Sequence, residues 1–218
     1  MILHGYWRSG TSYRTRIALN LKGLTYAQAG VDLRTGAQRS DAFRALNPQG
    51  LVPALEVGAD DGGPAVLTQS PAILEWLEEA FPTPPLLPAA ALDRAQVRAM
   101  AALIGCDIHP LNNLRVLTVL RTTFGADQAA IDAWAAGWIA PGFTALEALV
   151  ARHGGAWCFG DAPTLADCHL IPQIYSAGRF GVPVEAWPRL AAIAARAADH
   201  PAFAAAHPDR QPDADPAA

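Results

Sequence analysis

Cysteine is scarce in this chain, and the few cysteines lie far apart. Cys106, Cys158 and Cys168 are too few and too scattered to form a disulfide framework or a metal-binding cluster. We therefore expect no metal site, and we expect a reducing compartment, the cytoplasm, as the setting. Residues 1–4 enter a strand-like segment directly, without the basic and apolar regions of a secretory signal peptide.

Excess positive charge and long apolar runs are also lacking. The 218 residues carry a formal net charge of −4, which argues against nucleic acid as a main partner. No uninterrupted apolar run reaches the length needed to cross a membrane. What the chain does have is 51% hydrophobic and 17% charged residues, a composition typical of folded proteins with a substantial core. The length fits one or two domains.

Strands and helices alternate only in the first part of the chain. We predict strands over residues 3–7, 26–33, 52–57 and 65–68, and helices over residues 12–21, 40–46 and 71–80. Four prolines in residues 81–88 end the third helix and predict a stiff linker at 82–88. Later patterns are helical, over residues 93–119, 127–152, 165–179 and 187–197. The fold class is therefore α+β, with a mixed domain at 1–81 and an all-α domain at 89–218.

The second domain carries one recognisable helix start and ends in a polar tail. Thr164 and Asp167 have the spacing of a capping box and predict the start of a helix at Leu165. Residues 209–218 are polar and rich in proline, and we expect their end to be loose.

Small hydroxyl residues follow the first predicted strand. Ser9, Gly10, Thr11 and Ser12 come directly before a helical pattern of apolar residues. Such a turn presents hydroxyls and backbone N–H groups at a helix N-terminus, where an anion or a thiolate is favoured. Taken alone, the segment fits simple helix capping at least as well, because capping residues are common.

Two later segments place prolines at the starts of elements. Residues 47–55 put Pro53 just before an apolar strand, and an ordinary trans proline is the commoner state at such a position. In residues 67–74, Ser70 and Pro71 fit the N-cap and first positions of a helix.

This order of motifs resembles the zeta class of glutathione transferases, which includes maleylacetoacetate and maleylpyruvate isomerases. The resemblance continues through residues 160–167 to residues 210–213 and so covers nearly the whole chain. Residues 8–12 and 106–110 are most similar to the bacterial maleylpyruvate isomerases. The resemblance implies a thioredoxin-like domain followed by an all-α domain, the glutathione transferase fold. It also implies glutathione as the cofactor and a homodimer.

The resemblance assigns a set of glutathione-binding residues: Ser9, Gly10, Thr11, Gln49, Val52, Pro53, Gln69, Ser70, His109 and Asn113. Within this set, Gln69 and Ser70 hold the γ-glutamyl end of glutathione. The Val52–Pro53 peptide is implied to be cis and to face the cysteinyl backbone. His109 and Asn113, spaced i and i+4 on one helix face, reach the glycyl end; without the resemblance, His109 is an ordinary helical histidine.

The thiol-activating residues depart from the family pattern. Where the family has Ser-Ser-Cys, this chain has Ser9-Gly10-Thr11, so no role rests on a protein cysteine. Ser9 and Thr11 are the catalytic candidates, because a hydroxyl that donates a hydrogen bond to the sulfur favours the thiolate. The N–H groups of residues 10–12 are candidates for a share of that work.

The implied substrate is a maleyl compound with a carboxylate at each end, which calls for separated arginines. Arg8, Arg115 and Arg179 are the candidates, although Arg115 lies about 120° from His109 around an ideal helix. The predicted activity is glutathione-dependent cis-trans isomerisation. A transferase that conjugates glutathione to α-haloacids and a non-catalytic binding protein are the alternatives. Maleylpyruvate and maleylacetoacetate share the reacting part, so the sequence does not choose between them.

Overall fold

The computed structural model describes residues 1–58 and 63–215, and the chain divides into two compact units. Unit 1 comprises residues 1–84 together with 199–218, and unit 2 comprises residues 85–198. The tail, which we assigned to the second domain, therefore packs with the first unit. The domain division at residues 82–88 stays a prediction, and the end of the tail at 216–218 lies outside the described residues.

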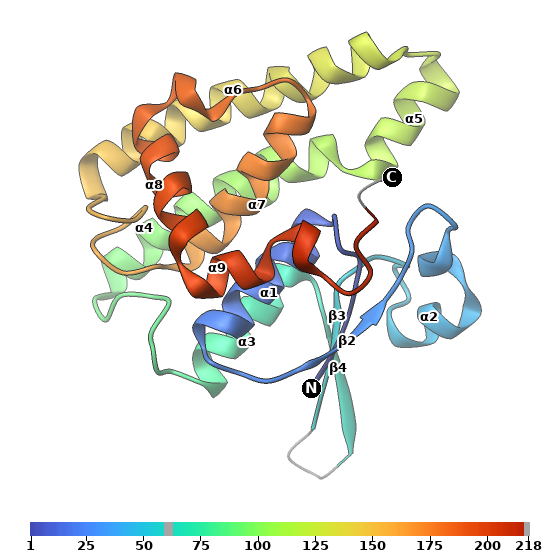
Figure 1. The fold of residues 1–218 in the computed structure, drawn as a ribbon, viewed down its shortest axis with the longest axis horizontal. Helices are drawn as coiled ribbons and strands as arrows, with labels where there is room; N and C mark the ends of the chain where they lie inside the picture. Colours follow the sequence, from blue (N-terminus) through green and yellow to red (C-terminus); the bar gives the residue numbers. More distant parts are fainter. Residues whose placement is uncertain (59–62, 216–218) are drawn as a thin grey trace. The chain divides into compact units, whose positions relative to one another are not determined.

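Unit 1 is built on a four-stranded sheet (Figure 1). The strands are β1 (Ile2–Gly5), β2 (Ala27–Gly30), β3 (Ala54–Gly58) and β4 (Pro64–Thr68), in the order β2-β1-β3-β4. β1 runs parallel to β2 and antiparallel to β3, and β3 runs antiparallel to β4. All four predicted strands are present, with ends shifted by a few residues. The thioredoxin-like prediction is confirmed.

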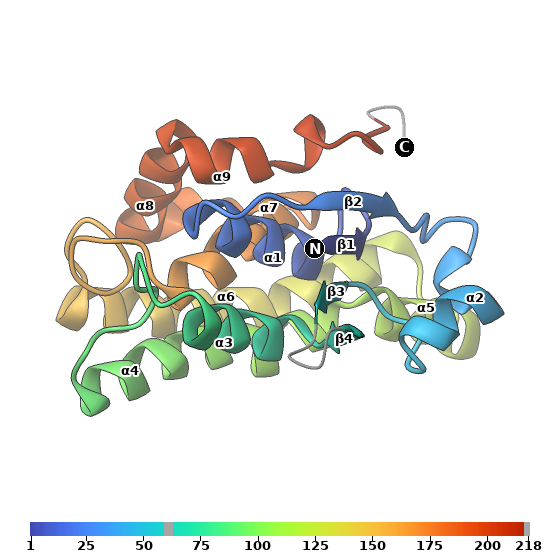
Figure 2. The ribbon, with the colours of Figure 1, turned by 90° about the horizontal axis from the view of Figure 1, so that it is seen from below.

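Helices cover both faces of this sheet. α2 (Asp41–Leu46) packs on the face that carries Ala54, where Phe43 also contacts the ring of His4. Side chains alternate along a strand, so Leu3 and Leu55 point to the opposite face. There they are almost fully buried, on the side of α1 (Gly10–Leu21) and α3 (Ser70–Ala80) (Figures 1 and 2).

α1 is buried on nearly every side rather than along one stripe. Every residue from Ser12 to Leu19 is buried, including Arg14 and Arg16. The additional cover comes from α9 (Pro201–Ala206), which packs beside α1 and receives a 2.9 Å hydrogen bond from Asn20 Nδ2 at the carbonyl of Ala202 (Figure 1). We did not predict α9, because six residues are too few to show a helical period.

Unit 2 is helical in its described residues. Its helices are α4 (Ala91–Ala102), α5 (Leu114–Phe124), α6 (Gln128–His153), α7 (Leu165–Arg179) and α8 (Pro188–Asp199, whose last residue falls in unit 1). Short 3-10 helices also occur in the connections, among them η1 (Ala37–Arg39) and η5 (Pro208–Arg210) in unit 1 and η4 (Val184–Ala186) in unit 2. Apart from one isolated bridge between Gly154 and Gly160, no strand occurs in the described part of unit 2.

The single helix predicted over residues 93–119 is wrong. α4 ends at Ala102 and continues as a π-helix, η2 (Leu103–Ile108), which passes into a 3-10 helix, η3 (His109–Asn112), before α5 begins. Single-turn π segments are frequent at functional sites. The π segment has six residues and the 3-10 segment has four, too few to show an apolar period of their own, so the sequence did not reveal the two breaks.

The predicted capping box at the start of α7 is confirmed. The buried carboxylate of Asp167 accepts hydrogen bonds from the N–H and the hydroxyl of Thr164, each at 2.8 Å, and from the N–H of Cys158 at 2.9 Å. Burial raises the pKa of Asp167, although these hydrogen bonds oppose the shift. The cap fixes the start of a helix whose interior is almost wholly buried.

Candidate active site

The turn between β1 and α1 leads directly into the capped N-terminus of α1. Ser9 is the N-cap of α1, where its Oγ accepts a hydrogen bond from the N–H of Ser12 at 3.3 Å. The N–H of Ser9 donates to the carbonyl of Tyr6 at 3.0 Å and closes the turn. Gly10 and Thr11 occupy the first turn of α1, where N–H groups have no partner within the helix. These N–H groups and the helix dipole favour a negative charge at this position.

Ser9 and Thr11, the two catalytic candidates, are joined in one hydrogen-bond chain. Thr11 Oγ1 donates to the carbonyl of Val52 at 3.0 Å, and Ser9 Oγ lies 2.9 Å from Thr11 Oγ1. Because the one proton of the Thr11 hydroxyl points to Val52, Ser9 is the donor to Thr11. These two hydrogen bonds link the α1 turn to the Val52–Pro53 peptide. That peptide is cis, as the resemblance implies.

Ser12 is excluded from direct contact with a ligand by its burial. Its side chain has no exposed surface, and its Oγ accepts the N–H of Tyr6 at 3.3 Å. A Cβ on Gly5 would lie only 2.9 Å from that oxygen, so α1 approaches β1 closely at this point. Ser12 therefore fixes α1 against the sheet.

The N-terminus of α3 carries a second cluster of predicted residues. Gln69 is the N-cap of α3 and has a φ of 64° and a ψ of 105°, a conformation that L-residues rarely adopt. Its Nε2 donates to Oε1 of Gln49 at 2.6 Å, so the structure brings these two candidates together. Backbone outliers of this kind cluster at ligand-binding sites. α3 begins at Ser70, one residue earlier than predicted.

Arg14 belongs to this cluster and was missed by the sequence reasoning. It is 2% exposed, and its Nη1 donates to Oγ of the buried Ser70 at 3.2 Å. A signal was present, because Arg14 stands three and seven residues before Ile17 and Leu21 and so lies on their predicted apolar face. A charge on a face that must be buried indicates a specific partner.

These groups fit glutathione in unit 1. A thiol would meet the α1 turn with its hydroxyls and N–H groups, and the cis Val52–Pro53 peptide adjoins it through Thr11. An amino-carboxylate would meet the N-terminus of α3, with Gln69 and the Ser70–Arg14 pair beside it. Both positions offer donors at a helix N-terminus, which is what the thiolate and the γ-glutamyl carboxylate require.

In unit 2, the structure changes the expected relation between His109 and Asn113. His109 opens the 3-10 helix η3, whereas Asn113 is the N-cap of α5, where its Oδ1 accepts the N–H of Arg115 at 3.1 Å. The two residues therefore do not share the face of one α-helix. The expected angle of about 120° between Arg115 and His109 does not apply either, because these two residues lie in different helices.

Asn112 is a further candidate in the same turn. Its side chain is 6% exposed, and neither amide atom has a hydrogen-bond partner among the described residues. A buried amide without partners is costly and calls for a specific reason, such as contact with a ligand.

The three candidate arginines lie in different settings. The guanidinium of Arg8 stands over the ring of the buried Trp7, with its Cζ 5.2 Å from the ring centroid. Arg115 is exposed in the first turn of α5, and Arg179 is exposed as the last residue of α7. The stacking contact holds Arg8 beside the α1 turn.

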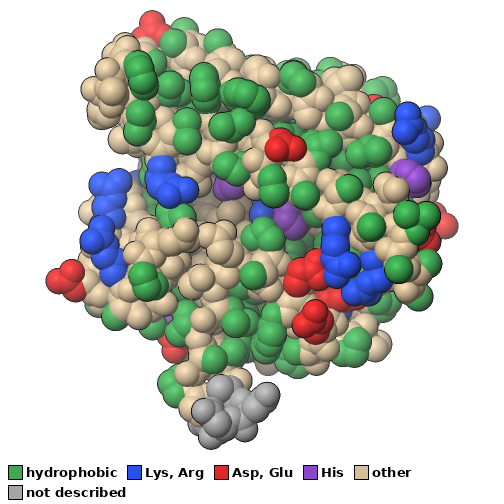
Figure 3. All heavy atoms as spheres, turned by 180° about the vertical axis from the view of Figure 1, so that it is seen from behind, with side chains coloured by type: hydrophobic (Ala, Val, Ile, Leu, Met, Phe, Trp, Pro, Cys, Tyr) green, Lys and Arg blue, Asp and Glu red, His purple; other side chains and the backbone are tan. Residues whose placement is uncertain are grey.

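Other classes of site find little support in the described residues. No group of three or more His, Cys, Asp or Glu side chains within 1–58 and 63–215 has an arrangement that would hold a metal ion. None of the described helices is both long and apolar enough to cross a membrane. Lys and Arg side chains on the face drawn in Figure 3 occur in small groups among apolar and acidic ones. All three cysteines are free, and burial raises the pKa of the Cys158 thiol.

A thioredoxin-like sheet with candidate ligand-binding groups at the N-termini of α1 and α3, followed by a helical region, is the architecture of the glutathione transferases. In agreement, the family model described as "Glutathione S-transferase, N-terminal domain" matches residues 8–80. The chain is 56% identical to a maleylpyruvate isomerase of a Ralstonia species, over 98% of this chain and 99% of that one. It is 53% identical to a maleylacetoacetate isomerase of Pseudomonas aeruginosa, over 98% of both chains. The chain belongs to the zeta class of the glutathione S-transferase family, among the maleylpyruvate and maleylacetoacetate isomerases.

Solved structures agree with this assignment. The holo structure of a maleylpyruvate isomerase, described as a bacterial glutathione S-transferase of the zeta class, superimposes with a TM-score of 0.94 at 55% identity. The match covers 99% of this chain and all of that one. A maleylacetoacetate isomerase of Anaeromyxobacter dehalogenans, with bound dicarboxyethyl glutathione and citrate, matches with a TM-score of 0.88 at 45% identity. That match covers 99% of this chain and 94% of the other. Relatives of this chain therefore bind glutathione and carboxylate ligands.

Proposed function

We propose that this protein isomerises a maleyl dicarboxylate, maleylpyruvate or maleylacetoacetate, to its fumaryl isomer with glutathione as coenzyme, in the degradation of aromatic compounds. The observation that carries the proposal is the α1 turn. It places two linked hydroxyls, Ser9 and Thr11, at a helix N-terminus and contains no protein cysteine. Such a turn can ionise the thiol of a bound cofactor but supplies no nucleophile of its own as strong as a thiolate.

The parts of glutathione are assigned to separate groups of residues. Gln69, Ser70 and the N-terminus of α3 bind the γ-glutamyl end, and Gln49 supports Gln69 through their 2.6 Å hydrogen bond. The Val52–Pro53 peptide faces the cysteinyl backbone. His109 and Asn113 of unit 2 bind the glycyl end, and Asn112 is added to this group because of its unpartnered buried amide.

Bound glutathione supplies a thiolate that adds reversibly to the maleyl double bond, so that the bond can rotate before the thiolate leaves again. The α1 turn lowers the pKa of the thiol through the Ser9 hydroxyl, which its hydrogen bond with Thr11 orients, and through the N–H groups of Gly10 and Thr11. A hydrogen bond to a charged group contributes about 1.5–3 kcal/mol. Ser9 can redirect its proton from Thr11 to the sulfur by a rotation of one hydroxyl, so the ionised form gains a donor without a backbone movement.

Arg8, Arg179 and Arg115 bind the two substrate carboxylates and stabilise the negative charge that develops on the substrate. Arg8 is held beside the α1 turn by its contact with Trp7, which places one cation next to the reacting sulfur. The dicarboxyethyl glutathione found in a relative supports the addition of the thiolate to an unsaturated diacid. Addition of a thiol to a four-carbon unsaturated diacid gives a compound of that type.

We further propose that the active form is a cytoplasmic homodimer. The glutathione transferase architecture pairs the first domain of one subunit with the helical domain of the other, and this chain has both parts. Large apolar side chains such as Leu92, which is 71% exposed, are available for such a contact. The cytoplasm is reducing and rich in glutathione, which suits a chain with three free cysteines.

Initial rates on three compounds test the proposed activity. With glutathione present, kcat/KM is measured for maleylpyruvate, for maleylacetoacetate and for a small α-haloacid. The proposal predicts that one or both maleyl compounds are turned over with a kcat/KM at least about a hundredfold above that of the haloacid, since paired arginines favour a dicarboxylate. The ratio of the two maleyl rates identifies the physiological substrate. A preference for the haloacid would show that the chain is a conjugating transferase instead.

A further inference from the structure

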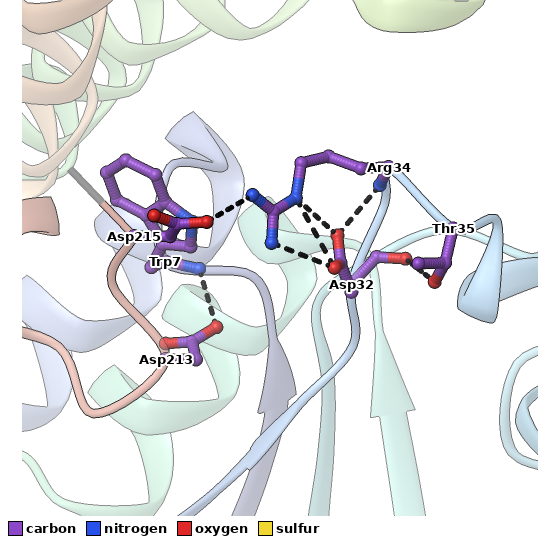
Figure 4. A network of polar contacts seen from close by, with 6 residues as sticks. All are labelled: Trp7, Asp32, Arg34, Thr35, Asp213 and Asp215. Atoms are coloured by element: carbon purple, nitrogen blue, oxygen red, sulfur yellow. Dashed lines mark hydrogen bonds and ion pairs between the residues drawn. The ribbon is translucent and has the colours of Figure 1, made fainter. Parts of the chain in front are cut away.

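Both backbone polar groups of Trp7 are connected to the C-terminal segment of the chain. The N–H of Trp7 donates to Oδ2 of Asp213 at 3.0 Å (Figure 4). The carbonyl of Trp7 accepts from Nη2 of Arg16 at 2.9 Å, and Nε of the same buried guanidinium donates to the carbonyl of Ala206 at 3.0 Å. Residues 206–213 therefore fix the two peptide groups that flank Trp7. Trp7 itself stands two residues before Ser9.

The segment that carries Asp213 is itself anchored in unit 1. Gln211 is 6% exposed, and its Nε2 donates to the carbonyls of Ala205 and His207 at 3.0 and 2.7 Å. Oε1 of Gln211 accepts from Nε2 of Gln28 in β2 at 3.0 Å. These contacts fix the segment against the outer strand of the sheet.

A second anchor lies beyond Asp213. Arg34 donates to Asp215 at 2.7 Å and forms a forked contact with both oxygens of Asp32 (Figure 4). The Arg34 guanidinium lowers the pKa of the Asp32 carboxyl, so this group of charges is intact at neutral pH. All three side chains are partly exposed to solvent, so the pairs contribute little to stability. Their geometry nevertheless fixes where the last described residues lie.

Asp213 packs closely against Gly30 of the sheet, where a residue with a side chain would force Asp213 to shift. A Cβ on Gly30, the last residue of β2, would lie 3.3 Å from Cβ of Asp213 and 3.5 Å from its Oδ2. Gly30 pairs with Gly5 at the end of β1, and the chain turns from there through Trp7 into α1. The carboxylate is thus packed against the end of the sheet where the α1 turn begins.

We propose that Asp213 is a positioning residue for the thiol-activating turn, acting through the N–H of Trp7. The orientation of Trp7 fixes the carbonyl of Tyr6 that accepts the N–H of Ser9, and the Trp7 ring supports the guanidinium of Arg8. Through these two contacts, Asp213 sets the N-cap geometry of Ser9 and the place of Arg8. The inference rests on the proposed function, in which that turn activates the thiol of glutathione.

The test compares Asp213→Leu with Asp213→Asn. The amide oxygen of asparagine still accepts the Trp7 N–H, whereas leucine has a similar size and accepts nothing. Asp209→Leu is the matched control, because its exposed carboxylate lies on the same segment without contact to the turn. For each variant, the near-ultraviolet absorbance of the bound glutathione thiolate is titrated against pH. The kcat/KM for the maleyl substrate and the Kd for glutathione are measured at a temperature well below thermal unfolding.

Asp213→Leu should raise the pH midpoint of the thiolate and lower kcat/KM by about tenfold or more, since small misplacements of reacting groups are costly. Asp213→Asn and Asp209→Leu should keep kcat/KM within about twofold of the parent value and the pH midpoint within about 0.3 pH unit of it. An Asp213→Leu protein with an unchanged midpoint and an unchanged kcat/KM overturns the inference. So does an equal fall of the midpoint in the Asn and Leu variants, because the carboxylate would then act through its charge.

Asp213→Ala covers the case in which Asp213→Leu fails to fold. It removes the carboxylate without inserting a large apolar side chain, and the inference predicts the same raised midpoint. An unchanged midpoint in the folded Asp213→Ala protein overturns the inference. The titration needs glutathione alone, so a parent protein that binds glutathione but does not isomerise maleyl compounds contradicts the proposed function and leaves this test intact.

Discussion

Ser9 and Thr11 share one hydroxyl chain, so their substitutions should not act independently. Ser9→Ala and Thr11→Ala should each lower kcat more than they weaken glutathione binding, because the peptide ends of glutathione are held elsewhere. The loss of a hydrogen bond to the thiolate corresponds to about 1.5–3 kcal/mol. In the double variant the cost should be less than the sum of the single costs, because the two side chains form one network.

The measurement is the pH midpoint of bound thiolate, with kcat and Kd, in the two single variants and the double variant. Thr11→Val serves as the control, because it keeps the shape of Thr11 without the hydroxyl. If the midpoint is the same in all of these proteins, the N–H groups of the α1 turn activate the thiol and the assignment to the hydroxyls is wrong.

Gln69 is held in a strained backbone conformation. Substitutions can separate the effect of this strain on stability from the role of the Gln69 side chain in glutathione binding. A non-glycine residue in such a region costs about 1–3 kcal/mol. Gln69→Gly should therefore leave the free energy of unfolding unchanged or raise it by about 1 kcal/mol, while the Kd for glutathione increases. Gln69→Ala should weaken binding in the same way without any gain in stability. Chemical denaturation and glutathione titration measure both quantities, and a Gln69→Gly protein less stable than Gln69→Ala would contradict the account.

Among the helices, the junction between η2 and η3 packs closely against α6. A Cβ on Gly142 would lie 2.3 Å from Cδ1 and 2.8 Å from Cγ1 of the buried Ile108, the residue before His109. Gly142→Ala should lower the free energy of unfolding by about 1–3 kcal/mol, as overpacking of a core does. It should also increase the Kd for glutathione, because His109 is displaced with Ile108.

Gly137→Ala is the matched control in the same helix. A Cβ at Gly137 meets no atom within 4 Å, so the substitution should raise stability by about 0.5–1 kcal/mol through helix propensity. Denaturation and glutathione binding are measured on both variants. Equal effects of the two substitutions would show that the contact between α6 and η2 does not position His109.

Most elements of unit 1 were predictable because their signals are local. Alternating or continuous apolar residues indicated the four strands, and Ser70 with Pro71 indicated the start of α3. The breaks around His109 were not predictable, since the π and 3-10 segments have only six and four residues, too few to show an apolar period of their own. The contact of Asp213 with Trp7 was equally hidden, because it joins residues 206 positions apart and involves a backbone N–H that no side-chain pattern records.

The candidate site was predictable to a similar extent. Ser9, Thr11, Gln69 and Ser70 were candidates from their motifs. The structure adds the hydrogen bonds that join Ser9 to Thr11, Gln69 to Gln49 and Ser70 to Arg14. The role of Arg14 required knowledge of which side chain it meets across the unit, since a charge on an apolar face indicates that a partner exists but not which one it is.

At the scale of the whole molecule, the account predicts a homodimer. Association would bury apolar side chains that the single chain exposes, among them Leu92. Sedimentation equilibrium at micromolar concentration should give about twice the mass of the chain, which is 23.0 kDa. A mass near 23.0 kDa over the whole concentration range would refute the dimer.

The central claim is that glutathione acts as a coenzyme and is not consumed. The most direct measurement follows the fumaryl product and the free thiol together while glutathione is titrated into the protein and its maleyl substrate. We expect almost no turnover without glutathione, saturating turnover as it is added, and a thiol concentration that is the same before and after many turnovers. Loss of one thiol for each substrate molecule consumed would contradict it and would make the protein a conjugating transferase.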